Sequence, residues 1–167
     1  MATTHFKGNP VQTSGNLPEV GAAAPDFKAV GETLAEVSLS QFKGKNVLLN
    51  LFPSIDTPTC ATSVRKFYQE ATGLDNTVVL NVSLDLPFAA KRFCAAEGLE
   101  NAHTVSDFRF HEVGEKYGLV MQDGPLAGLL ARAVVVVDAE GKVKHVELVP
   151  EIAQEPDYAS ALAALKA

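Results

Sequence analysis

The sequence has 167 residues, of which 47% are apolar and 20% are charged, as is typical of a folded globular domain rather than a disordered chain. Fourteen basic against twenty acidic residues give a net charge of −6, which argues against non-specific binding to nucleic acid. A chain of this length holds one substantial core, so we expect a single domain over residues 1–167.

The first residues, 1–15, contain no apolar segment of the kind found in secretory signals. The longest apolar runs of the chain are also shorter than a membrane span. We therefore expect a cytoplasmic protein without membrane contact, in a compartment where permanent disulfides are uncommon. Two cysteines are too few for a four-cysteine zinc site and the four histidines lack ligand-like spacing, so we expect no metal.

The N-terminal half of the chain begins with strand signals. The turn residues Gly8-Asn9-Pro10 lie between short strand-like pieces and predict an N-terminal hairpin. An extended piece is expected near residues 27–30, followed by a strand end and a polar turn in residues 37–45. Residues 46–52, NVLLNLF, form a short apolar run with polar or turn residues on both sides, which indicates a buried central strand.

A helix, a second strand and a second helix are expected to follow residues 46–52. Apolar residues at 64, 67, 68 and 71 recur at helical spacing and predict a helix that ends near Gly73. Residues 77–85 are rich in β-branched side chains and predict a second buried strand. Asp85 is expected to cap a second helix, which carries Pro87 in its first turn and ends near Gly98.

The C-terminal part is expected to close the sheet. Residues 112–118 predict a short helix or turn, and residues 132–149 predict two strands joined by a turn at Asp138 to Gly141. Residues 155–167 predict a helix. The order of elements indicates an α/β protein with a thioredoxin-like fold: a mixed central sheet, helices on both faces and an N-terminal β-hairpin.

One cysteine lies where such a fold places its reactive site, between the first central strand and the first long helix. Thr57 is a good N-cap and Pro58 a good first helical residue, which puts Cys60 in the first turn. Free backbone N–H groups and the positive end of the helix dipole stabilise a thiolate there. The alternative is that Cys60 is a small buried hydrophobe without chemistry.

The residues around Cys60 restrict the chemistry further. A dithiol exchange site needs a second cysteine three positions earlier, and that position is Thr57, whose hydroxyl suits an oxygen-bearing substrate. Cys94, on the second helix, is the other thiol that could condense with an oxidised Cys60, or else a buried helix residue. Arg132 opens an apolar strand, where a guanidinium beside Cys60 would favour the thiolate, although the sequence does not establish that contact.

The stretch PSIDTPTC, Pro53 to Cys60, together with residues 76–99, 123–138 and 155–167, resembles the bacterial thiol peroxidases. These form the atypical two-cysteine branch of the peroxiredoxin family, and the similarity covers nearly the whole chain. It implies that Cys60 is the peroxidatic and Cys94 the resolving cysteine, which form a redox disulfide. It further implies that Thr57 and Arg132 hold the peroxide and that Pro53 shields the pocket.

The resemblance also implies the reaction and the partners. Such enzymes reduce hydrogen peroxide and organic hydroperoxides, use no metal or other cofactor, are recycled by thioredoxin and form homodimers. One position departs from the pattern, because residue 59 is Thr where many relatives have an apolar residue. Because a disulfide needs Cα atoms within about 7 Å, we expect one of the two cysteine helices to unwind on oxidation.

Two other functions are compatible with the sequence. A disulfide reductase or chaperone-like binding protein could use the same fold, although the missing Cys-x-x-Cys argues against a reductase. A structural protein with two inert cysteines is the other alternative. Reduction of insulin without peroxide would support the first alternative, and absence of peroxide consumption would support the second.

Overall fold

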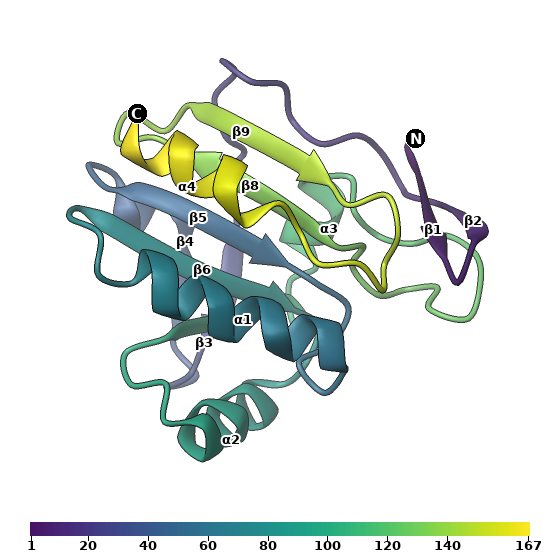
Figure 1. Ribbon diagram of the computed structural model, residues 1–167, viewed down its shortest axis with the longest axis horizontal. Helices are drawn as coiled ribbons and strands as arrows, with labels where there is room; N and C mark the ends of the chain where they lie inside the picture. Colours follow the sequence, from purple (N-terminus) through teal and green to yellow (C-terminus); the bar gives the residue numbers. More distant parts are fainter.

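The computed structural model describes residues 1–167 and is built on a seven-stranded sheet in the order β4-β3-β7-β6-β5-β8-β9 (Figure 1). Strands β5, β6 and β7 are parallel to one another, whereas β3–β4, β3–β7, β5–β8 and β8–β9 are antiparallel pairs. The predicted mixed sheet is therefore confirmed. The strands are β3 Lys28–Gly31, β4 Glu36–Ser38, β5 Asn46–Leu51, β6 Thr77–Ser83, β7 His103–Ser106, β8 Ala133–Val137 and β9 Val143–Leu148.

The central strands are apolar on both faces because both faces are covered. In β5, Leu49 contributes to the larger core cluster, while its neighbour Leu48 contributes to a second cluster on the opposite face. Val135 and Val134 of β8 alternate between the two clusters in the same way. This explains why the central strands appear in the sequence as continuous apolar runs rather than as an alternating pattern.

Helices lie on both faces of the sheet, as predicted. Helices α1 (Pro58–Ala71) and α4 (Tyr158–Lys166) pack side by side on one face, where Phe67 and Leu165 share a core cluster (Figure 1). Helix α2 (Pro87–Glu97) packs beside α1 and β7. On the other face lies the short α3 (Glu112–Lys116), and a 3₁₀ turn, η1, spans Leu39–Phe42. None of the helices combines the length and apolar character needed to cross a bilayer.

The predicted N-terminal hairpin is present as a separate two-stranded sheet, β1 (Thr3–Phe6) and β2 (Asn9–Gln12). Its two-residue turn is Lys7-Gly8, and both residues have positive φ angles, +52° and +81°, which suits a tight hairpin turn. Asn9 and Pro10, which the sequence placed in the turn, therefore belong to β2.

The expected helix boundaries hold at most ends, with one correction. Pro87 occupies the first position of α2, and Gly98 ends that helix with φ +68°. The N-cap of α2 is Leu86, so the prediction that Asp85 caps this helix is wrong. The Asp85 carboxylate instead accepts hydrogen bonds from the Ser54 hydroxyl and the Ile55 N–H, in the segment that precedes α1.

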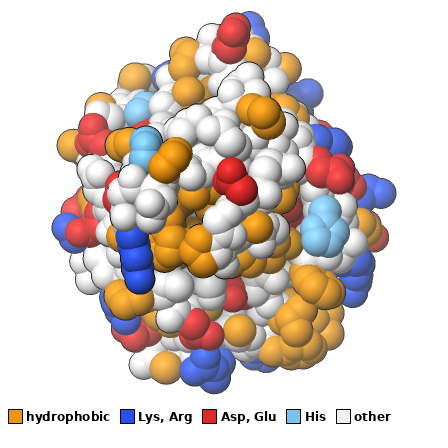
Figure 2. Space-filling model, turned by 90° about the vertical axis from the view of Figure 1, so that its right-hand side faces the viewer, with side chains coloured by type: hydrophobic (Ala, Val, Ile, Leu, Met, Phe, Trp, Pro, Cys, Tyr) orange, Lys and Arg blue, Asp and Glu red, His pale blue; other side chains and the backbone are white.

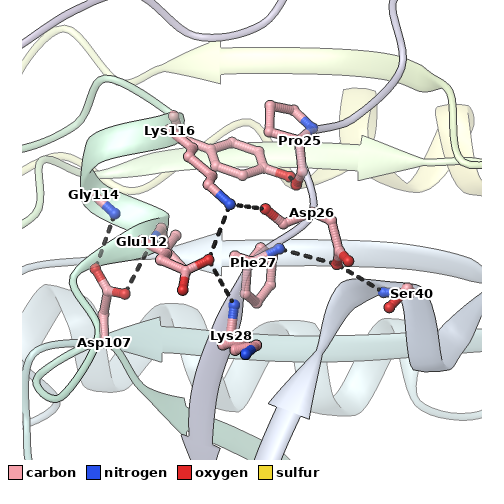
Figure 3. Close-up of polar contacts among 11 residues, drawn as sticks. Pro25, Asp26, Phe27, Lys28, Ser40, Asp107, Glu112, Gly114 and Lys116 are labelled. Atoms are coloured by element: carbon pink, nitrogen blue, oxygen red, sulfur yellow. Dashed lines mark hydrogen bonds and ion pairs between the residues drawn. The ribbon is translucent and has the colours of Figure 1, made fainter.

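Helix α3 is attached to the rest of the molecule by a network of satisfied polar groups (Figure 3). The buried Asp107 carboxylate accepts hydrogen bonds from the backbone N–H groups of Val113 and Gly114, at 3.0 and 2.9 Å. The ammonium group of Lys116 donates to Glu112 and to the backbone carbonyl of Asp26. These contacts fix α3 against the segment that leads into β3.

Candidate active site

Cys60 lies in the first turn of α1, as the sequence predicts. Thr57 is the N-cap residue, with extended backbone angles of φ −99° and ψ 146°, and Pro58 follows as the first helical residue. The Thr57 side chain accepts no capping hydrogen bond from the helix, and its hydroxyl donates to the carbonyl of Ser54 at 2.9 Å. A hydroxyl whose proton is engaged in this way is left with an oxygen that can accept a further hydrogen bond.

Arg132 contacts the Cys60 sulfur directly. Because Leu51 of β5 pairs with Ala133 of β8, the residue before β8 lies at the end of β5 from which the chain continues to α1. The Arg132 Nη2 donates to Cys60 Sγ at 3.1 Å, and its Nε donates to the carbonyl of Ile152 at 2.8 Å. The contact that the sequence left open between Arg132 and Cys60 is thus present in the structure.

The charge of Arg132 has no carboxylate to balance it. Its side chain is fully buried, at 1% exposure, yet the three ion pairs of the protein all involve other, more exposed residues. Its Nη1 also has no hydrogen-bond partner. A buried charge needs polar partners, and those that Arg132 has are the Ile152 carbonyl and the Cys60 sulfur.

A pocket of about 260 Å³ opens beside this pair. Pro53, Thr57 and Arg132 all line it, so the structure brings three of the predicted site residues to one cavity. Seen from the side of the N-terminal hairpin, the surface is hollowed and hydrophobic side chains gather in the hollow (Figure 2). The remaining lining residues are mainly apolar or small: Phe6, Ser54, Pro58, Thr59, Leu126, Leu129, Ile152 and Ala153. Cys60 itself is 0% exposed and does not line the pocket, but its sulfur contacts Arg132, which does.

Thr59 has a structural contact. Its hydroxyl donates to the carbonyl of Ala153 at 3.1 Å and thereby joins α1 to the loop beside the pocket. The same loop is tied to the hairpin turn through Glu151, whose carboxylate accepts from the N–H groups of Lys7 and Gly8. Sequence reasoning missed this support, because more than 140 residues separate the two ends of the contact.

Cys94 lies on α2 in the same apolar cluster as Cys60, and both thiols are free. It is 7% exposed, and burial, assisted by the negative charge of Glu32, raises the pKa of its thiol to about 11. Cys94 is therefore protonated at neutral pH. The apolar side chains of Phe52, Ile55, Ala61, Val64 and Phe93 complete this cluster.

Polar contacts at the surface join the two cysteine helices. The Arg65 guanidinium binds the Glu97 carboxylate through two hydrogen bonds, at 2.9 and 2.8 Å, and also lies over the Phe93 ring. Nearer the start of α1, Arg92 pairs with Asp56 at 3.1 Å. The sequence shows these charges on helix surfaces, but it does not show that they face one another.

The protein has no group of three or more histidine, cysteine or acidic side chains arranged to hold a metal ion. The site brings together a buried thiol, a guanidinium with a spare donor, and a hydroxyl oxygen beside an apolar pocket. Such an arrangement suits attack by sulfur on an electrophilic atom whose leaving group gains negative charge as the bond between them breaks.

Comparison with known proteins agrees with this chemistry. The Redoxin family model matches residues 19–162. The chain is 58% identical to a thiol peroxidase of Mycobacterium tuberculosis over the full length of both proteins. It is 56% identical to a thiol peroxidase of Corynebacterium glutamicum over 99% of both.

Solved structures show the same fold. A peroxiredoxin-like protein from Aquifex aeolicus superposes with a TM-score of 0.94 at 42% identity, covering 99% of this chain and 96% of that one. A thiol peroxidase from Chromobacterium violaceum gives a TM-score of 0.90 with the same coverage, and its 19% identity supports the fold alone. The chain belongs to the Redoxin family and, within it, to the thiol peroxidases.

Proposed function

We propose that this protein is a thiol-dependent peroxidase that reduces hydrogen peroxide and organic hydroperoxides. The observation that carries the proposal is the buried Arg132, which has no carboxylate partner, donates to the Cys60 sulfur and keeps Nη1 unpartnered. A structural arginine would have its donors satisfied. An unsatisfied donor next to a thiolate is ready to bind the oxygen of a substrate.

The first step is attack by the Cys60 thiolate on the terminal oxygen of the hydroperoxide. A sulfur–oxygen bond forms as the oxygen–oxygen bond breaks, and the electron pair leaves with the alkoxide, which takes a proton and departs as an alcohol or water. Arg132 Nη1 donates to the oxygen that gains charge, while the Thr57 oxygen accepts the peroxide O–H. Cys60 is left as a sulfenic acid, and Pro53 limits access of water to it.

In the second step, Cys94 resolves this intermediate. Its thiol condenses with the sulfenic acid, which gives a disulfide between Cys60 and Cys94 and releases one water. Both cysteines lie in intact helices within a packed apolar cluster, and Cys94 is protonated, since burial raises the pKa of its thiol to about 11. Unwinding of the first turn of α1 or of α2 therefore precedes the reaction, because it exposes the thiol and brings the sulfurs together.

A dithiol of the thioredoxin type returns both cysteines to thiols by exchange. The relatives are named thiol peroxidases and the chain matches them end to end, which supports a peroxidase cycle. We further propose that residues 1–167 form a single domain that works as a homodimer without a cofactor. A disulfide reductase is less well supported, because Thr57 occupies the position that a second active-site cysteine would need.

The test is stopped-flow mixing of the reduced protein with hydrogen peroxide and, separately, with cumene hydroperoxide. Mass spectrometry then identifies the bond between Cys60 and Cys94. Cys60→Ser is expected to reduce consumption of both peroxides to background, because a hydroxyl is a far weaker nucleophile at neutral pH. Cys94→Ser is the matched control and should still reduce one equivalent, while losing turnover with thioredoxin. Consumption of peroxide by Cys60→Ser at the wild-type rate would refute the proposal.

A further inference from the structure

Asp85 lies between β6 and α2, but its carboxylate faces the segment that leads into α1. One oxygen, Oδ1, accepts a hydrogen bond from the Ser54 hydroxyl at 2.8 Å, and Oδ2 accepts one from the Ile55 N–H at 2.7 Å. The Ser83 hydroxyl also donates to Oδ2, at 2.7 Å, and accepts from the Asp85 N–H. Asp85 is thus held by its own strand end while it binds residues thirty positions earlier.

The contact with Ser54 continues to the active-site threonine. The Ser54 carbonyl accepts from both the N–H and the hydroxyl of Thr57, at 3.1 and 2.9 Å. The Ser54 hydroxyl also accepts from the Asp56 N–H at 3.2 Å. Asp85 therefore orients Ser54, and Ser54 orients the residue that caps the Cys60 helix. Asp85 neither bonds to Cys60 nor lines the pocket of Arg132, so its role would be one of positioning.

The other side of Asp85 is the beginning of the Cys94 helix. The next residue, Leu86, is the N-cap of α2, and Pro87 is its first helical residue. A single carboxylate thus contacts the turn before one cysteine helix and adjoins the first turn of the other. Hydrogen bonds to a charged acceptor are stronger than those between neutral groups, so the Asp85 contacts form a strong polar link between the two segments.

We propose that Asp85 couples the two cysteine segments: it holds the Thr57 turn in the conformation that reacts with peroxide, and its release allows α1 and α2 to open together for disulfide formation. This inference rests on the proposed peroxidase function. When the first turn of α1 unwinds, Ser54 and Ile55 leave the carboxylate, and the start of α2 loses the group that anchored it. The chain thereby passes from the reactive state to the resolving state in one transition.

The first test uses Asp85→Asn, whose amide cannot accept both the Ser54 hydroxyl and the Ile55 N–H with the same geometry. We expect the peroxide step to slow and the disulfide step to accelerate, each by about tenfold, as two rates separated by stopped-flow mixing. Ser54→Ala removes the hydroxyl that bonds to Asp85 and Asp56 but keeps the Ile55 N–H bond to Asp85, so it should shift both rates in the same directions by less. If Asp85→Asn fails to fold, the two rates of Ser54→Ala test the proposed coupling.

Glu97→Gln is the matched control, because it weakens another link between α1 and α2 without touching the Thr57 turn. This variant should accelerate disulfide formation and leave the peroxide step unchanged. If Asp85→Asn likewise accelerates disulfide formation and leaves the peroxide step unchanged, Asp85 only stabilises the packing of the two helices and the proposed coupling is wrong. If both of its rates fall together, the opening is not controlled by Asp85.

A second measurement does not depend on peroxide chemistry. Amide hydrogen exchange of the reduced protein should be faster in residues 54–60 and in residues 86–94 of Asp85→Asn, with the rest of the sheet unchanged. Faster exchange in only one of these segments would overturn the coupling. A wild-type protein that consumes no peroxide would refute the proposed function, while the exchange data would still decide whether Asp85 links the two segments.

Discussion

Two buried charged residues of this molecule have different surroundings, and the difference distinguishes a structural role from a reactive one. Asp107 and Arg132 are both 1% exposed. The Asp107 carboxylate accepts two backbone hydrogen bonds at the start of α3, within a network that leaves none of its oxygens without a donor (Figure 3). Arg132 keeps an unpartnered Nη1, forms no ion pair and donates to a cysteine.

Packing is also tighter around Asp107 than around Arg132. At α3, a Cβ added to Gly114 would lie 2.7 Å from a Val120 methyl group and 2.9 Å from Leu130, so the region has no spare space. Beside Arg132, a pocket of about 260 Å³ remains open. A buried charge that is satisfied and tightly packed stabilises the fold, whereas one that is unsatisfied beside a cavity is prepared for a ligand.

The largest effect is expected for Arg132→Met, which keeps much of the side-chain volume but removes the guanidinium. The peroxide step should slow by about 10²–10³-fold, as for loss of one preorganised donor to a developing oxyanion. The thiolate fraction of Cys60 at neutral pH, followed by ultraviolet absorbance and by the rate of alkylation, should fall as well. Stopped-flow rates give the first quantity.

Arg109→Met is the control for this substitution, because Arg109 lies over the Phe110 ring and has no contact with Cys60. It should leave both the peroxide rate and the thiolate fraction unchanged. An Arg132→Met variant with the wild-type thiolate fraction would show that the cation does not set the ionisation of Cys60. Arg132 would then no longer differ from Asp107 in having a chemical role.

Local patterns in the sequence were sufficient to predict the strand–helix units and the position of Cys60. The apolar run of β5 and the Thr57-Pro58 pair mark a buried strand and a helix start, and both signals act within a few residues. Arg132 was identified because a charge at the head of an apolar strand needs a partner. The identity of that partner required the β5–β8 pairing, which no local pattern encodes.

Contacts between distant loops could not be predicted in the same way. Asp85 precedes a helix that begins with Pro87, so its sequence context is that of an N-cap, and only the fold brings the Ser54 and Ile55 donors to it. The support of Arg132 by the Ile152 carbonyl depends likewise on tertiary structure. These side-chain contacts compete with local propensity and win because they satisfy a charged or buried group.

The ionisation of Cys94 extends the comparison to a buried thiol. Burial raises its pKa from 9.0 to about 11, so the folded protein keeps a proton that the unfolded chain releases. The resulting stability is complete below about pH 9 and is lost as the pH rises toward about 11, by at most about 2–3 kcal/mol. Urea unfolding of the reduced wild type, compared with Cys94→Ser across this range, measures the difference.

Cys94→Ser lacks this titration, so its unfolding free energy should depend less steeply on pH between about 9 and 11. The lysines and tyrosines titrate in both proteins and cancel in the comparison. Parallel pH profiles for the two proteins would mean that Cys94 is not shielded from water in the reduced state. It would then need no unwinding of α2 in order to react.

The smallest effect on the peroxide reaction is expected for a substitution at Asp107, which tests whether the α3 region is independent of the Arg132 pocket. Asp107→Ala leaves the N–H groups of Val113 and Gly114 buried without an acceptor, which should lower the free energy of unfolding by about 1–3 kcal/mol in urea titrations. The peroxide step should keep its wild-type rate, because α3 lies on the face of the sheet away from α1 and none of its residues lines the pocket. A peroxide rate that falls together with stability would show that the α3 network also supports the active site, and the division between a structural and a reactive buried charge would no longer hold.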